Sequence, residues 1–214
     1  MLKEYSPFSK ETIHLMERYH NYQDLRVNES EGVDYQIHLR HGQSGIAVMA
    51  PHGGGIEPGT TEIADAVAGD EHAFYSFEGL KKRGNSRLHI TSHCFDEAAG
   101  IDLAKKCKTI VTIHGFKDDG EIIVIGGLDK ALKEKIQEAL GTAGFKIGED
   151  SDFPGKSAQN ICNRSCRGVG VQLEISLGLR RLMFRDLTRV TRGDTTDLFK
   201  LFVSALRLVL EGIR

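Results

Sequence analysis

The sequence predicts an α/β protein with a mixed, mostly parallel sheet and helices on both faces. Short apolar, β-branched runs that are typical of buried strands alternate with segments whose apolar residues recur at helical spacing. The chain has 214 residues, of which 40% are hydrophobic and 27% charged, so its composition is that of an ordinary globular protein. No repeat or low-complexity tract divides it. We therefore expect a single domain over residues 1–214, with residues 1–30 as a helical N-terminal cover.

The first half of the chain alternates between these two patterns. Residues 9–25 carry apolar side chains on one helical face, and residues 35–40 alternate polar and apolar side chains, as a strand with one wet face does. The segments that follow are expected to be a buried strand over 45–50, a helix opened by a Thr cap over 61–67, strands over 72–77 and 88–92, and a helix over 96–107.

The second half contains the clearest helix, over residues 129–140. Leu132, Ile136 and Leu140 recur every four residues, Asp129 is placed to cap the helix, and Gly141 follows its end. The other expected elements are strands over 108–114, 121–125 and 169–175 and helices over 177–187 and 195–213. Residues 148–168 read as a long loop, which in a compact domain usually has a function.

Charge and composition narrow the class of protein. The formal net charge of −2 argues against a generally basic nucleic-acid binder. The N-terminus lacks the apolar core of a signal peptide and no apolar run is long enough to span a membrane, so we expect a cytoplasmic protein, or one released by cell lysis. Four cysteines in a chain this long do not make a disulfide scaffold, so in a reducing compartment they are expected to be thiols: Cys94, Cys107, Cys162 and Cys166. Cys162 and Cys166 without a second pair make only a weak zinc motif.

The chain is organised around residues 48–61, a strand end followed by a glycine-rich loop. His52 and Glu57 stand on either side of Gly53, Gly54 and Gly55. Glycine allows backbone conformations closed to other residues and a close approach of a ligand. An imidazole and a carboxylate on one short loop form a plausible half of a metal site.

Two further residues stand near the ends of later strands. His114 ends one β-branched run, and Glu174 lies in another apolar strand. Ligands collect beyond the carboxyl ends of strands in open α/β sheets, so these side chains are expected to meet His52 and Glu57. Two imidazoles and a carboxylate are a common ligand set for catalytic zinc. His93 is the alternative to His114 as the third ligand.

Glu174 is the candidate general base. A buried carboxylate must be paired or have a raised pKa, and a base that deprotonates a water at a metal fits that demand. A structural pair with an arginine is the alternative for Glu174, and turn or strand-end hydrogen bonding is the alternative for the histidines.

A substrate-binding group is predicted in the long loop. Arg164 offers a planar guanidinium beside the amide of Asn163, a good clamp for a carboxylate. Arg87 would extend a positive surface for an anionic substrate, although exposed arginines are often merely solvated.

The order of these residues is similar to that of carboxypeptidase A-type zinc peptidases, and it resembles more closely the small phage and prophage poly-γ-glutamate hydrolases. The resemblance is carried by residues 50–60, 113–115 and 172–176 and spans roughly residues 30–210. It implies a zinc-carboxypeptidase-like fold and a zinc enzyme that cleaves γ-glutamyl amide bonds. His52, Glu57 and His114 would hold zinc, Glu174 would be the base and Arg164 would bind a substrate carboxylate.

The chain is much shorter than carboxypeptidase A-type enzymes, so we expect an open cleft and cleavage inside an anionic polypeptide, with residues 53–55 leaving room for the polymer. Two alternatives remain open at this point. One is another zinc amidase or deacylase acting on peptidoglycan-type or acyl-amino-acid substrates. The other is a non-enzymatic, phage-related replication or nucleic-acid-associated protein.

Overall fold

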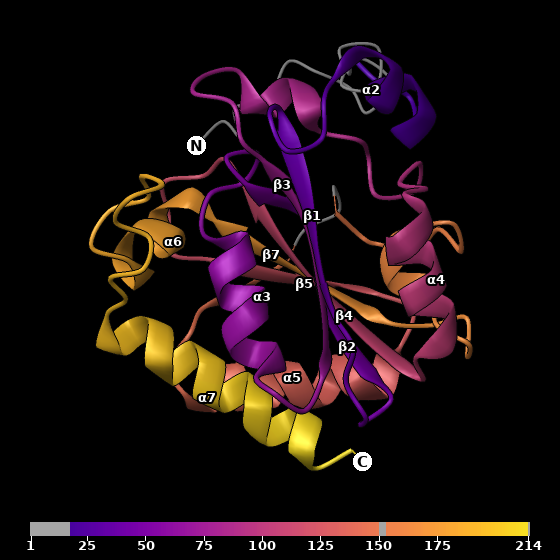
Figure 1. The fold of residues 1–214 in the computed structure, drawn as a ribbon. Coiled ribbons are helices and arrows are strands. Elements are labelled where there is room, and N and C mark those ends of the chain that lie inside the picture. Colours follow the sequence, from indigo (N-terminus) through magenta and orange to yellow (C-terminus); the bar gives the residue numbers. More distant parts are fainter. Residues whose placement is uncertain (1–17, 150–152, 214) are drawn as a thin grey trace, which may run out of the picture.

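A seven-stranded sheet forms the centre of the molecule in the structure, a computed structural model that describes residues 18–149 and 153–213 (Figure 1). The spatial order of its strands is β1-β3-β2-β4-β7-β5-β6. Their bounds are β1 (Tyr35–Arg40), β2 (Ile46–Gly54), β3 (Ala73–Gly79), β4 (Thr109–Phe116), β5 (Ile123–Gly127), β6 (Ile147–Gly148) and β7 (Val171–Ser176). The inner strands β3, β2, β4 and β7 run parallel, while β1 and β5 run antiparallel to β3 and β7. The predicted mixed, mostly parallel sheet is confirmed.

Helices cover both faces of this sheet, as expected (Figure 1). One face packs against α3 (Thr60–Ala68), α5 (Lys130–Thr142), α6 (Leu177–Met183) and α7 (Asp197–Glu211). The other packs against α2 (Tyr22–Asn28), α4 (Ala98–Lys106) and the 3-10 turns η1 (Asn85–Leu88) and η2 (Ile161–Asn163). Strand side chains alternate between the two cores: Ile46 and Val48 face α3, whereas Ala47 and Met49 face the α4 side.

Most helix ends follow the local signals in the sequence. The Asp129 side chain accepts a hydrogen bond from the Leu132 amide and caps α5, as predicted. The start of α3 differs, because its N-cap is Gly59 in the left-handed region and no threonine caps it. Helix α6 ends at Met183 rather than near residue 187, because Phe184 is extended and forms a bridge to Thr195.

The first described helix begins later than the sequence predicted. Residues 1–17, and with them about half of the helix predicted over 9–25, lie outside the described residues. The described helix α2 begins at Tyr22, where the Asn21 side chain caps it, and continues to Asn28. Tyr19 and His20, which the periodicity placed in the helix, precede it.

The strand predicted over residues 88–92 is wrong. Residues 85–88 form η1, and residues 89–92 join none of the strands in the described parts of the chain. The neighbouring strand β3 already pairs with β1 on one edge and β2 on the other, so no sheet edge is open there. Leu88 and Ile90 are nevertheless buried in the core on the α4 side, which explains their apolar pattern.

None of the helices in residues 18–149 and 153–213 has the length and apolar content that crossing a bilayer requires.

Candidate active site

Strand β2 does not end where the sequence indicated, but continues through the first glycines with an irregularity. Ala50 lies opposite Ser76 on β3, and Gly53 lies opposite Glu78. Three steps along β2 therefore match two along β3, so β2 carries one extra residue, as in a β-bulge. Pro51 lies within this irregular stretch, where the lack of an amide N–H is tolerated.

The irregularity aims His52 at the α4 side of the sheet. By strict alternation, His52 would face α3 as Val48 does. Its ring instead lies against Phe95, with ring centroids 6.5 Å apart, and against His114, with centroids 4.9 Å apart. One inserted residue thus places His52 on the same face as the histidine of β4.

The three glycines that follow serve close packing. A Cβ atom at Gly53 would lie 2.3 Å from Ser76 Oγ, one at Gly54 would lie 2.7 Å from the Gly79 carbonyl oxygen, and one at Gly55 would lie 2.4 Å from Asn85 Nδ2. Gly54 also has φ of +62°, in the left-handed region. Protein atoms fill the space that a side chain would take, so the expectation that these glycines leave room for a bulky polymer is wrong.

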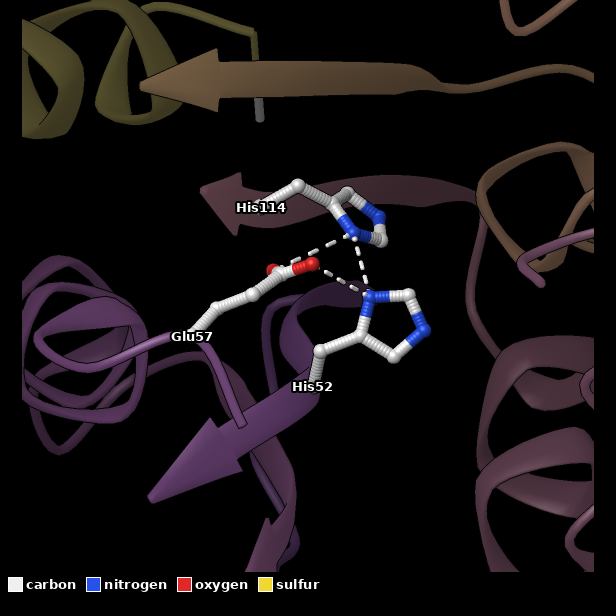
Figure 2. Close-up of side chains that lie close together, drawn as sticks. All are labelled: His52, Glu57 and His114. Atoms are coloured by element: carbon white, nitrogen blue, oxygen red, sulfur yellow. Dashed lines mark hydrogen bonds and ion pairs between the residues drawn. The ribbon is translucent and has the colours of Figure 1, made fainter. Parts of the chain in front are cut away.

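His52, Glu57 and His114 converge on one point (Figure 2). His52 Nδ1 lies 3.0 Å from Glu57 Oε1 and 3.1 Å from His114 Nδ1, and His114 Nδ1 lies 3.8 Å from Glu57 Oε2. The two histidines are 2% and 1% exposed. The structure thus brings together the three residues that the sequence proposed as ligands.

Backbone groups orient two of these side chains. The Ile90 carbonyl oxygen accepts from His52 Nε2–H at 2.8 Å, so a neutral His52 ring presents its Nδ1 lone pair to the cluster, whereas a protonated ring donates Nδ1–H to Glu57. The Gly115 amide donates to Glu57 Oε2 at 2.8 Å, which fixes the carboxylate. Such outer partners hold ligands in the orientation that metal binding requires.

The electrostatics favour the metal-binding protonation states of Glu57 and His114. Burial alone would raise the pKa of Glu57, but the charge of His52 and its hydrogen bond outweigh burial and lower that pKa to about 2. Burial, followed by the charge of His52, lowers the pKa of His114 to about 3. At neutral pH the carboxylate is therefore ionised and the His114 imidazole is neutral, the forms that bind a metal.

The donor set and its spacing fit zinc. Tetrahedral zinc with bonds of about 2.0–2.1 Å places its ligand atoms about 3.3 Å apart, close to the separations observed here. Two imidazole nitrogens and one carboxylate oxygen also leave a fourth position open, as catalytic zinc sites do. The alternative ligand His93 is exposed and lies outside the cluster. Cys162 and Cys166 also lie outside it, and all four cysteines are free thiols.

Glu174 stands beside the cluster. It pairs with His114 in the register of the parallel strands β4 and β7, so the two side chains share one face of the sheet. Glu174 is 7% exposed, and Gln172 Nε2 donates to its Oε1 at 3.4 Å. Asn160 Nδ2 in turn donates to Gln172 Oε1 at 2.8 Å. A buried carboxylate is thus held next to the candidate metal site by a short chain of amides.

The predicted substrate residues differ in their placement. Asn163 is buried, its amide nitrogen donates to the carbonyls of Gly155 and Ser157, and its oxygen accepts from two backbone amides. Its hydrogen-bonding capacity is used by backbone groups of the protein, which leaves none for a substrate. Arg164 is half-buried beside it, and among the described residues its guanidinium forms no hydrogen bond or ion pair. Arg87 is exposed in η1.

Two residues that the sequence did not indicate border the cluster. The His89 ring lies 3.9 Å from the His52 ring, centroid to centroid, and His89 Nε2 lies 3.7 Å from Glu57 Oε1. Arg180, from α6, reaches the backbone next to Glu57. His89 follows a turn, and Arg180 lies on a helix beside a second arginine, Arg181, so neither has a local pattern that marks it as part of a site.

Comparison with known proteins gives consistent matches over nearly the whole chain. A family model described as poly-gamma-glutamate hydrolase matches residues 19–205. The SPbeta prophage-derived protein YoqZ of Bacillus subtilis (strain 168) is 37% identical over 193 residues, which cover 89% of this chain and 70% of that protein. A bacteriophage poly-gamma-glutamate hydrolase structure has a TM-score of 0.89 at 35% identity, covering 92% of this chain and 98% of that one. The zinc-free structure of YndL, also a Bacillus subtilis protein, has a TM-score of 0.88 at 33% identity, with the same coverage.

Proposed function

This chain belongs to the poly-γ-glutamate hydrolase family, and we propose that it cleaves the γ-glutamyl amide bonds of that polymer at a zinc centre. His52, Glu57 and His114 are the proposed zinc ligands and Glu174 is the proposed general base. One observation carries this assignment: three metal-ligand atoms lie within 4.8 Å of one another, next to a buried carboxylate that pairs in register with a ligand strand.

Zinc bound there would act as a Lewis acid on the scissile carbonyl and lower the pKa of water. The rest of the chemistry falls to side chains of this chain. A Glu174 carboxylate oxygen takes the proton of the attacking water and returns it to the departing amine nitrogen. The hydrogen bond from Gln172 holds Glu174 in place for both transfers, and burial of the site limits access of bulk water.

The polymer supplies a free carboxylate on every unit, and the arginines are the groups to hold it. Arg164 is the stronger candidate, because its half-buried guanidinium has no partner among the described residues. Arg87 lies two residues before His89, on the segment that packs over His52, and would contact another unit of an extended chain. A polymer that lies across the site in this way would be cut internally.

The test uses the purified protein and purified poly-γ-glutamate. Each cleavage releases one amine, so new amino groups measure the reaction and the size distribution of the polymer reports where it is cut. We expect hydrolysis to stop on removal of metal with a chelator and to return with stoichiometric zinc. An early fall in mean polymer length would support internal cleavage, whereas steady release of single residues from intact polymer would contradict it.

The same experiment addresses the substrate class. Peptidoglycan-type fragments and acylated amino acids would use the same zinc chemistry, so they are assayed beside the polymer at matched amide concentration. The family match favours the polymer. Faster turnover of either small substrate would overturn that preference and leave the zinc centre intact.

A further inference from the structure

Arg180 is a buried cation directly behind the candidate active site. It lies on α6, one turn after the end of β7, and is 3% exposed. Among the described residues, no carboxylate lies within ion-pair distance of its guanidinium. A fully buried charge without a paired carboxylate is costly and rare, so its other contacts are informative.

Those contacts are three backbone carbonyl oxygens from separate segments. Nη1 donates to Pro58 at 2.7 Å, Nε donates to Ile175 at 3.1 Å and Nη2 donates to Phe116 at 3.2 Å. Pro58 directly follows Glu57 and Ile175 directly follows Glu174, whereas Phe116 comes two residues after His114. One guanidinium therefore joins the three segments that carry a zinc ligand or the base.

The surroundings leave space for this group. A Cβ atom at Gly115 would lie 2.4 Å from Arg180 Cζ, so glycine at that position lets the guanidinium approach β4. Burial lowers the pKa of Arg180, while the negative charges of Glu57 and Glu174 raise it and keep the guanidinium charged. Both acids of the proposed site therefore act on the same buried cation.

We infer that Arg180 is a positioning residue that fixes the spacing between the zinc ligands Glu57 and His114 and the base Glu174 by binding the backbone next to each. This role rests on the proposed zinc hydrolase function. Arginine suits it because its planar fork directs several N–H groups outward at fixed angles, whereas the lysine ammonium is a single point on a flexible stem. Substrate has no part in these contacts, because all three acceptors belong to the backbone.

The experiment compares Arg180→Met and Arg180→Lys with the full-length wild type. Arg40→Met is the control. Arg40 lies on β1, the edge strand far from the site, and its Nη2 also donates to a backbone carbonyl, that of Gly69. Zinc affinity is measured by competition with a chromophoric chelator, kcat and KM are measured on poly-γ-glutamate, and thermal unfolding is measured without metal. Loss of outer partners commonly weakens metal affinity or activity by about 10–100-fold, and we expect Arg180→Met to fall in that range with KM unchanged.

The three readouts separate positioning from general support of the fold. Arg180→Lys should recover part of the zinc affinity and kcat, and Arg40→Met should match wild type in both. A lower unfolding temperature for Arg180→Met with wild-type zinc affinity and kcat would overturn the proposal, and so would a higher KM with kcat unchanged. If Arg180→Met does not fold, Arg180→Lys and Gly115→Ala, which crowds the guanidinium, decide the question by the same measurements. A wild-type protein that neither binds zinc nor cleaves the polymer would instead contradict the proposed function.

Discussion

His114 and Glu174 lie directly opposite each other on the paired parallel strands β4 and β7. Because side chains alternate along a strand, this register puts a proposed zinc ligand and the proposed base on the same face of the sheet. A shift of one residue would send one of the two to the opposite face. The register between two neighbouring strands is thus the feature that joins metal binding to proton transfer.

Replacing Glu174 with glutamine should abolish hydrolysis and leave zinc binding intact. Glutamine keeps the size of the side chain but cannot take a proton, and general acid–base catalysis contributes about 10²–10⁴-fold to rate. Zinc content is measured by elemental analysis, and kcat by amine release. Glu78→Gln, which changes a strand glutamate hydrogen-bonded to Gln36, is the control. Wild-type turnover in Glu174→Gln would remove the base assignment.

The ligand assignment predicts which histidines hold the metal. His52→Ala and His114→Ala should each lose stoichiometric zinc, because each removes one of three converging ligand atoms. His93→Ala should retain zinc, because His93 is exposed and lies outside the cluster. Zinc per chain after dialysis is the measurement. If His93→Ala lost zinc while His52→Ala and His114→Ala retained it, the ligand assignment would be wrong.

Arg164 is expected to act in substrate binding. Removing a charge-assisted contact costs about 1.5–3 kcal/mol, so Arg164→Ala should raise KM for the polymer by about 10–100-fold with a smaller change in kcat. Arg167→Ala is the control from the same loop, because Arg167 is exposed and already paired with Asp129 at 3.0 Å. Equal KM values for the two variants would contradict a binding role of Arg164.

The packing of the glycine loop predicts a stability effect at Gly54. An L-residue in the left-handed region costs about 1–2 kcal/mol, and overpacking at this site adds about 1–3 kcal/mol. Gly144 has φ of +90°, but a Cβ atom added there would meet no atom within 4 Å, so Gly144→Ala isolates the backbone cost. Denaturant unfolding should show a larger loss of the free energy of unfolding for Gly54→Ala than for Gly144→Ala. Equal losses would mean that contact with Gly79 has no role.

Acid should destabilise the metal-free protein below about pH 6.5. The pKa of His114 is about 3 in the folded state against an ordinary 6.5, so the unfolded chain takes up the proton first and stability falls as pH drops below 6.5. Glu57, with a folded pKa of about 2 against an ordinary 4.5, adds a loss in the same direction below pH 4.5. Each proton contributes at most about 1.4 kcal/mol per pH unit.

The measurement is denaturant unfolding of zinc-free protein between pH 7 and pH 4. In His114→Ala the free energy of unfolding should no longer fall as the pH drops below about 6.5, whereas in His93→Ala it should still fall as in the wild type. An identical pH dependence in wild type and His114→Ala would show that His114 takes up its proton at the same pH in the folded and unfolded states, which would contradict the lowered pKa.

Local pattern was enough to predict much of the architecture. The β-branched run before His114 and the four-residue repeat of Leu132, Ile136 and Leu140 each produced the element expected, because strand alternation and helical periodicity are recorded within a few neighbouring residues. The same reasoning failed at Leu88 and Ile90, where apolar residues are buried without joining a strand. Burial leaves a hydrophobic pattern whether or not a partner strand is available.

The sequence by itself indicated His52, Glu57 and His114 as zinc ligands, with His93 as an alternative to His114, because imidazole and carboxylate groups after a strand or in a glycine-rich loop can be recognised from neighbouring residues. Only the tertiary structure decided how they meet. The extra residue of β2 turns His52 toward His114, the Ile90 carbonyl oxygen accepts from His52 Nε2–H, and the Asn163 side chain is occupied by backbone groups. Arg180 binds Pro58 from 122 residues away. Contacts between segments so distant leave no periodicity in the chain, since they depend on how the sheet brings those segments together.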